Sequence, residues 1–226
     1  MTSLYLGAAD PSAAQILEKS IQYHDPNGEW SSLNTTFILE ETRPSGEIRK
    51  FEVAFNLPNQ SFRYEKKDDE NHIIKTLEGE TCGAWFNGST QFSKEIEEKH
   101  RLSCDRIKWF RNYYLYLYGL PMKLTDPGTI LDPKPEKTQF MGKDVWSLKV
   151  TYEPGVGGEV WLFYVDPESF ALTGCRFYRK DVTKDGEYII YEEETKVGTM
   201  RLPKNRTWHM NVDGKLLGTD ILAGSK

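Results

Sequence analysis

Features that would assign a function directly are scarce in this sequence. No stretch reaches the roughly 20 consecutive apolar residues that a membrane-spanning helix needs, so no transmembrane segment is expected. Basic residues are not in excess: the formal net charge is −5, and lysine and arginine are interspersed with aspartate and glutamate. A nucleic-acid partner is therefore not expected, because no basic stripe is available to follow a phosphate backbone.

Motifs of catalysis and of metal binding are also missing. The sequence has no G-x-S-x-G elbow, no H-E-x-x-H pair and no P-loop. None of the four histidines is spaced with another ligand type as a metal site requires. The glycines at 155–158 precede a strand pattern and not a helix, which favours a hairpin loop over a phosphate cradle. We expect no catalytic residue, no metal and no cofactor, and an enzyme using dispersed acidic and histidine residues is the third-ranked hypothesis.

Cysteines are few. Cys82, Cys104 and Cys175 form no C-x-x-C pair, and their odd number argues against a disulfide framework. Cysteine commonly behaves as a small apolar residue, so three buried free thiols are the first expectation. A single disulfide is the alternative if the protein is exported, but sequence separation alone does not tell which sulfurs approach within bonding range.

The first nine residues are small and apolar but include no basic residue. They are interpreted either as the remnant of a signal peptide or as an ordinary flexible terminus. A periplasmic or cell-envelope location follows from the first interpretation, and a cytoplasmic one from the second.

The remainder, residues 10–226, predicts a single domain dominated by antiparallel strands. The aromatic content of 13% suits a pleated sheet, and residues 51–57 alternate between large apolar and smaller or polar side chains. Short turns separate most such segments, which indicates hairpins. The pattern predicts about ten or eleven strands. They lie at 35–42, 48–57, 60–65 and 71–77, in a segment that ends at 86, and at 146–152, 160–165, 172–179, 187–196, 207–212 and 215–221. A sheet of this size must curve strongly or close.

Two helices interrupt the strand pattern. Asp10 and Pro11 predict the start of a helix that continues to His24 with one apolar face. A second helix is predicted from a cap at Ser103 to residue 118, with Gly119 as a left-handed terminator. Residues 126–135 are interpreted as a proline-interrupted crossing between the two runs of strands. The fold class is mainly β (α+β), a strongly curved antiparallel sheet covered by an N-terminal helix and a central helical insertion.

The second helix is apolar on nearly all sides, which is its most informative property. Such a helix must be covered on nearly all sides. It is either a core helix packed on the sheet or a helix whose aromatic face lines a cavity, and tyrosine hydroxyls suit such a cavity. The candidate ligand-binding residues are Trp109, Phe110, Tyr113, Tyr114 and Leu117.

The order of elements also resembles a known family. The stretches that carry the resemblance are residues 14–24, 142–152, 160–167 and 207–220. They resemble the LolA-like half-barrel proteins, the fold of periplasmic lipoprotein carriers, and most closely an uncharacterised Bacteroidota family of unknown function. The resemblance implies an unclosed barrel whose concave face, covered by helices, holds an acyl chain or another lipid.

Taken together, these observations favour a non-enzymatic binding protein of the cell envelope. Its expected partner is a lipid or another apolar small molecule held between the curved sheet and the aromatic helix. The alternative is a protein–protein interaction module of the cell envelope that binds no small molecule and docks an envelope protein through an open sheet edge or the aromatic face.

Overall fold

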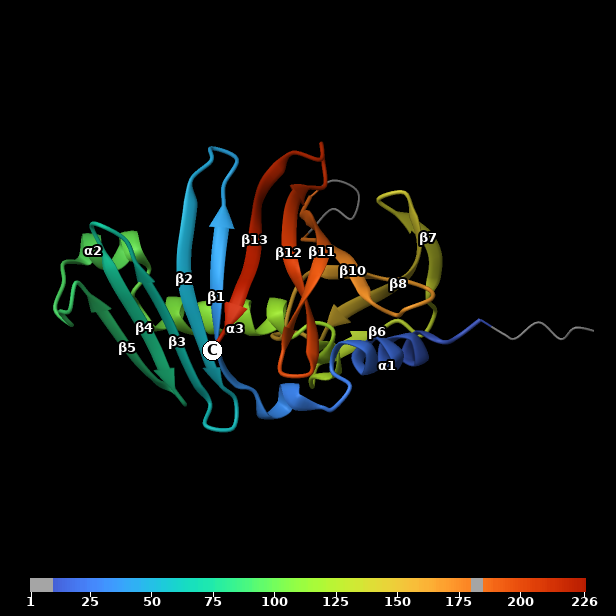
Figure 1. Ribbon diagram of the computed structural model, residues 1–226, viewed down its shortest axis with the longest axis horizontal. Coiled ribbons are helices and arrows are strands. Elements are labelled where there is room, and N and C mark those ends of the chain that lie inside the picture. The colour runs from blue at the N-terminus through green and yellow to red at the C-terminus, as the bar shows by residue number, and fades with distance from the viewer. Residues whose placement is uncertain (1–9, 180–184) are drawn as a thin grey trace, which may run out of the picture.

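A computed structural model describes residues 10–179 and 185–226, and it shows one open antiparallel sheet (Figure 1). The sheet has 13 strands in the order β5-β4-β3-β2-β1-β13-β12-β11-β10-β9-β8-β6, and β7 also pairs with β8. The strands are β1 (Asn34–Thr42), β2 (Ile48–Asn56), β3 (Ser61–Lys67), β4 (His72–Glu78), β5 (Thr81–Phe86), β6 (Thr129–Leu131), β7 (Glu136–Phe140), β8 (Lys143–Tyr152), β9 (Val160–Val165), β10 (Leu172–Tyr178), β11 (Glu187–Val197), β12 (Met200–Met210) and β13 (Leu216–Ser225). The mainly antiparallel sheet predicted from the sequence is confirmed, and it is open and not closed (Figure 1).

Pairing of β1 with β13 joins the two runs of strands into one sheet. The last residues of the chain lie opposite the first strand, with Phe37 facing Ser225 and Thr42 facing Thr219 in the register. All other strand pairs are also antiparallel, and most of them join neighbours in sequence. The N-terminal and C-terminal strands therefore contribute side chains to the same central part of the sheet.

The strand count differs from the expected ten or eleven because two short strands were missed. Strand β6 lies inside the stretch interpreted as a proline-interrupted crossing, and β7 follows directly after it. Both pair with β8. Proline cannot donate to a strand ladder, but Pro127 and Pro135 stand just outside these strands and leave the short ladders intact.

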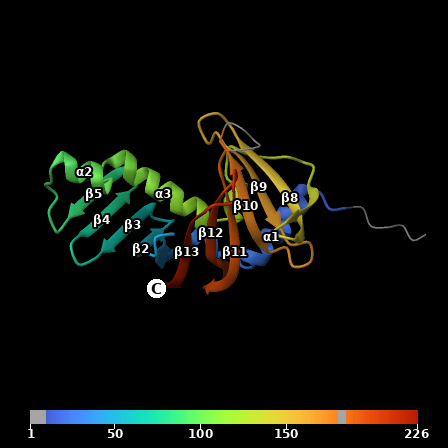
Figure 2. The same cartoon turned by 90° about the horizontal axis from the view of Figure 1, so that it is seen from above.

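In the described part of the chain, three α-helices accompany the sheet: α1 (Ala13–His24), α2 (Lys94–His100) and α3 (Cys104–Tyr118). The cap of α1 is Ser12 and not the expected Asp10. Ser12 Oγ accepts the Gln15 N–H, and the Gln15 side chain accepts the Ser12 N–H, which is a capping box. Figure 2 shows α3 running along one face of the sheet from α2 toward β12, and α1 lying at the other end beside β8.

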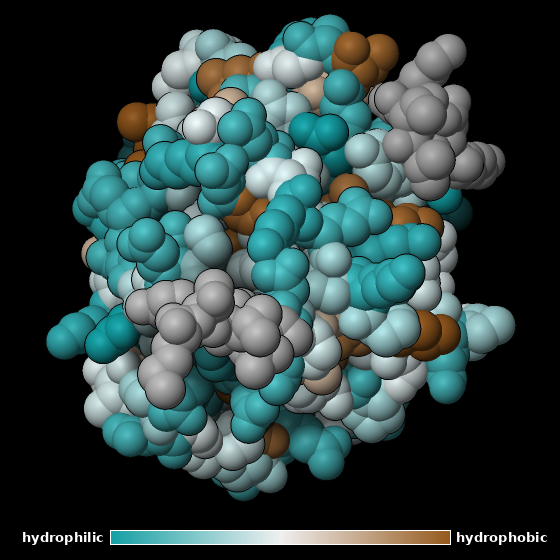
Figure 3. All heavy atoms as spheres, turned by 90° about the vertical axis from the view of Figure 1, so that its right-hand side faces the viewer, coloured by the Kyte–Doolittle hydropathy of each residue, from teal (hydrophilic) through white to brown (hydrophobic). Residues whose placement is uncertain are grey.

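The core lies between α3, α1 and the face of the sheet that they cover. Its fully buried side chains come from both halves of the chain and include Phe37, Phe55, Phe62, Leu148 and Phe163. A second, smaller cluster of Phe140, Val145 and Tyr164 covers the opposite face of β9. Strand β9 is thus covered on both faces, as its continuous apolar sequence predicted. The surface at the β7 and α1 end is mostly hydrophilic, with only scattered apolar residues (Figure 3).

Candidate functional site

One side of α3 is packed into the core. The ring of Phe110 lies 5.3 Å from that of Tyr64, and the ring of Tyr114 lies 5.7 Å from that of Phe51. The buried Lys75 contacts the same rings, with Nζ 3.6 Å from the centroid of Phe110 and 4.8 Å from that of Tyr64. Burial lowers the pKa of Lys75 to about 7, and the positive charge of Arg101 adds to this shift.

The other side of α3 faces a cavity of about 530 Å³. It lies between α3 and the end of the sheet where β1 ends and β13 begins. Its lining residues are Glu41, Arg43, Trp109, Tyr113, Tyr116, Leu117, Glu159, Trp161, Phe177, Arg179, Glu187, Trp208, Leu217, Gly218 and Asp220. The volume falls within the range of roughly 300 to 1,000 Å³ that is typical of small-molecule sites.

Aromatic rings make up much of the lining. Trp109 stacks on Tyr113 at 5.0 Å between centroids, and Tyr113 stacks on Trp208 at 6.4 Å. A second group is formed by Trp161, which stacks on Phe177 at 4.6 Å and meets Tyr116 edge to face at 5.3 Å. These contacts fix the rings on one another, so the apolar part of the cavity is largely preformed.

Charged groups from adjacent strands complete the cavity. Glu41 on β1 and Asp220 on β13 are direct partners in the strand register. Oδ2 of Asp220 accepts the indole N–H of Trp208 at 2.8 Å, and Arg43 lies 3.3 Å from Glu41. Burial raises the pKa of Asp220 to about 6, and the negative charge of Glu41 adds to this shift.

A second hollow of about 330 Å³ adjoins the cavity and shares Tyr116, Glu159 and Trp161 with it. The hydroxyl of Tyr116 is hydrogen-bonded to that of Tyr152, which lines the second hollow. Burial raises the pKa of Tyr152 to about 12, so both phenols are neutral at physiological pH. Tyr116 therefore stands between the two hollows with its hydroxyl held in place.

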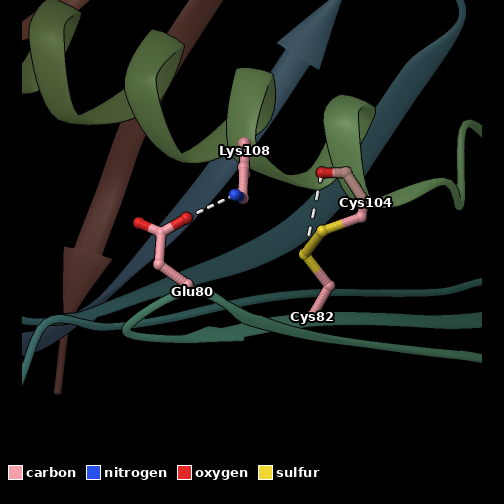
Figure 4. Close-up of a disulfide and its surroundings, with 4 residues drawn as sticks. All are labelled: Glu80, Cys82, Cys104 and Lys108. Atoms are coloured by element: carbon pink, nitrogen blue, oxygen red, sulfur yellow. Dashed lines mark hydrogen bonds and ion pairs between the residues drawn. A yellow bond between two sulfur atoms is a disulfide. The ribbon is translucent and has the colours of Figure 1, made fainter.

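A disulfide between Cys82 and Cys104 attaches the first residue of α3 to β5, with the Cα atoms 5.5 Å apart (Figure 4). Lys108, one turn further along α3, forms an ion pair with Glu80 in the turn before β5. The expectation of three free thiols was wrong: only Cys175 is free, and it is buried. The sequence separation of 22 gave no sign that the β5 turn and α3 meet.

The five candidate residues fall into two groups. Trp109, Tyr113 and Leu117 line the cavity, whereas Phe110 and Tyr114 face the core on the other side of α3. Strand residues of the cavity such as Trp208 and Asp220 were not predicted, because they reach it only through pairing of distant strands. Among the described residues, no group of three or more histidine, cysteine, aspartate or glutamate side chains is placed to hold a metal ion.

Comparison with protein families identifies the chain. A family model described as a family of unknown function, DUF6503, matches residues 2–224. The chain belongs to this family. A comparison with curated protein sequences gives no match. No helix among the described residues is long and apolar enough to cross a membrane.

Solved structures show the same fold at low sequence identity. A LolA superfamily protein from Nitrosomonas europaea is 14% identical with a TM-score of 0.56, covering 96% of this chain and 94% of its own. A domain described as outer membrane lipoprotein-sorting, from Vibrio parahaemolyticus, is 10% identical with a TM-score of 0.51, covering 95% and 92%. A DUF1329 family protein from Desulfovibrio piger is 11% identical with a TM-score of 0.51, covering 96% and 93%. This chain thus has the LolA-like fold.

Proposed function

We propose that this protein is a non-enzymatic binding protein of the cell envelope that holds a lipid or another apolar ligand between its curved sheet and α3. The observation that carries the proposal is the cavity of about 530 Å³ beside α3 and its stacked aromatic lining. Small-molecule sites are usually concave and combine apolar walls with placed polar groups, and this cavity has both aromatic rings and charged side chains in its lining.

Two further observations support the proposal. The disulfide between Cys82 and Cys104 fits an oxidising compartment such as the periplasm, because cytosolic thiols are normally kept reduced. The similar structures include a LolA superfamily protein and a domain described as lipoprotein-sorting. Since fold alone does not decide function, the cavity carries the argument and the similarity only agrees with it.

The ligand-binding residues of the proposal are Trp109, Tyr113 and Leu117 on α3, joined by Trp161 and Trp208 from the sheet. Trp109 is 44% exposed and stands at the surface of the cavity, so its side chain contributes little to the core. Phe110 and Tyr114 support the helix from the core side. Their role in binding is to hold α3 in position, not to contact the ligand.

The first test is native mass spectrometry, with organic extraction, of protein purified from its source organism. A co-purifying lipid of defined mass supports the proposal and gives the ligand class. A bare mass contradicts it when the protein also fails to bind Nile red, a neutral apolar dye. If the mass of the protein assembly rises with protein concentration and no dye binds, the result favours the protein-interaction module instead.

Variants connect dye binding to the cavity. Trp109→Ala should weaken Nile red binding by about fivefold or more, because it removes one ring of the aromatic lining. The matched control is Trp85→Ala, which removes a partly exposed tryptophan of β5 outside the cavity and should leave binding unchanged. Tyr114→Ala should lower the free energy of unfolding by about 3 to 5 kcal/mol, the usual cost of deleting a buried aromatic side chain. Equal losses of dye binding in the two tryptophan variants would contradict the assigned site.

A further inference from the structure

The charges in the cavity are unevenly matched. Its lining has the carboxylates Glu41, Glu159, Glu187 and Asp220 but only the guanidinium groups of Arg43 and Arg179. Each arginine is already in an ion pair with a carboxylate: Arg43 lies 3.3 Å from Glu41, and Arg179 lies 2.9 Å from Glu187. Among the described residues, Glu159 and Asp220 have no ion-pair partner. Among its described lining residues, the cavity therefore has more carboxylates than guanidinium groups.

Asp220 is the carboxylate in closest connection with the aromatic lining. Its Oδ2 accepts the indole N–H of Trp208, and the indole stacks on Tyr113, which stacks on Trp109. The rings thus lead from the exposed surface of the cavity to the carboxylate. Aromatic faces attract cations through their quadrupoles, and aromatic rings that surround a site commonly recognise quaternary ammonium groups.

Two arginines lie near Asp220, but each has other partners: Arg206, its register partner on β12, donates to the carbonyl of Pro203, and Arg43 is ion-paired with Glu41. Burial and the carboxylate of Glu41 raise the pKa of Asp220, and the Trp208 hydrogen bond and the charges of Arg206 and Arg43 only partly oppose this shift. A cation placed beside Asp220 would offset the cost of keeping this carboxylate ionised. An anionic group in the same place would face Asp220 and Glu41 together, which is unfavourable.

We propose that the ligand is a cationic amphiphile, whose ammonium headgroup lies against Asp220 and the rings of Trp208 and Tyr113 and whose apolar chain lies along Leu117 and Phe177. This inference rests on the proposed function and adds the charge of the ligand to it. It excludes fatty acids and anionic phospholipids as the preferred ligands.

The experiment compares three amphiphiles that share a decyl chain: decyltrimethylammonium, decyldimethylamine oxide and decanoate. The amine oxide has no net charge near neutral pH and nearly the shape of the ammonium group. Binding is measured by isothermal titration calorimetry at pH 7.5, below the critical micelle concentrations. Decyltrimethylammonium should bind about tenfold more tightly than the amine oxide, because one cation–π contact together with one carboxylate contact can supply a difference of this size. Decanoate should bind most weakly.

The variant Asp220→Asn isolates the charge, because asparagine has the same shape and can still accept the indole N–H of Trp208. It should weaken decyltrimethylammonium binding by about tenfold and leave amine oxide binding unchanged. The matched control is Asp105→Asn in the first turn of α3, which changes the net charge equally but lies outside the cavity. Circular dichroism melts show that each variant is folded.

The outcomes separate the two proposals. If all three amphiphiles bind with similar affinity, or if decanoate binds best, the cationic headgroup is ruled out while a binding function remains. If Asp105→Asn weakens ammonium binding as much as Asp220→Asn does, the effect is one of net charge and the assignment to Asp220 fails. If neither these amphiphiles nor Nile red binds, the proposed function fails as well.

Discussion

The indole N–H of Trp208 donates a hydrogen bond of 2.8 Å to Oδ2 of Asp220 on the neighbouring strand. The carboxylate thus lies among the aromatic rings of the cavity, and burial raises its pKa to about 6. A buried group whose pKa is raised is unfavourable in its charged form. Asp220 therefore reduces the stability of the folded protein above pH 6, which agrees with the binding role proposed for it.

Asp220→Asn should accordingly stabilise the protein in a pH-dependent way. The folded-state pKa lies above the value of about 3.9 in the unfolded chain, so the contribution of Asp220 to stability is fully present below pH 4 and is lost as the pH rises through 6. At pH 8 the variant should exceed the wild type in free energy of unfolding by about 1 to 3 kcal/mol, and at pH 4 the difference should vanish. Urea denaturation at both pH values measures this. A difference that does not change with pH would contradict the assignment.

His24 predicts the opposite dependence on pH. Its ring is buried, Nδ1–H donates to the carbonyl of Arg201 at 2.5 Å, and Nε2 accepts the N–H of Leu172 at 2.8 Å. This pattern requires the neutral ring, and burial lowers the pKa of His24. The unfolded chain takes up a proton as the pH falls below about 6.5, whereas the folded chain does not, so His24 stabilises the fold above that pH and this contribution is lost as the pH falls through the lowered pKa.

The variant His24→Gln isolates this contribution. It should lower the free energy of unfolding at pH 7.5 by about 1 to 3 kcal/mol, since the end of α1 loses buried hydrogen bonds to two strands. It should also flatten the decline in stability between pH 7 and pH 5. Denaturant titrations of both proteins across this range give the two slopes, and identical slopes would show that His24 does not carry the pH dependence.

The disulfide gives a prediction that needs no ligand. Protein unfolded in guanidinium without reductant should show one reactive thiol, that of Cys175, and three after reduction. Replacing Cys82 and Cys104 together by serine should lower the free energy of unfolding by about 2 to 4 kcal/mol, because the unfolded chain is no longer cross-linked. Three reactive thiols before reduction would mean that the purified protein lacks the bond.

The sequence predicted the strands and helices of this fold better than it predicted which of them pack or pair with one another. Alternation at residues 51–57 and the continuous apolar run at 160–165 identified strands β2 and β9, because side-chain burial has the period of the strand itself. The strands β6 and β7 escaped because three and five residues are too few to show a period. The disulfide and the β1–β13 pairing escaped because they join distant residues, and no local pattern records such pairing.

The same limit explains the partial prediction of the cavity. A helix apolar on nearly all sides indicates that α3 has more than one face to cover, but not which face meets the core. Phe110 and Tyr114 turn toward β2 and β3, where Phe51 and Tyr64 are already large and apolar. The face of α3 with Trp109 and Tyr113 lies opposite strands whose side chains include glutamate, aspartate and tryptophan. These side chains do not fill the space beside α3, so a cavity with charged groups in its lining remains. These strand residues look like ordinary strand surface in the sequence.

The sequence correctly indicated that α3 ends at Gly119, but for the wrong reason. A left-handed terminator was expected after α3, but the φ angle of Gly119 is −90°. The position requires glycine because of close packing: a Cβ atom there would lie within 2.7 Å of the carbonyl oxygen of Leu115 and would clash with the ring of Trp30.

Gly119→Ala should therefore lower the free energy of unfolding by about 1 to 3 kcal/mol, the usual cost of overpacking. The matched control is Gly158→Ala, because no atom lies within 4 Å of a Cβ added there, and that variant should change stability by less than about 1 kcal/mol. Thermal and urea denaturation of the two variants measure the difference, and equal stability would show that the turn after α3 shifts to admit the extra methyl group.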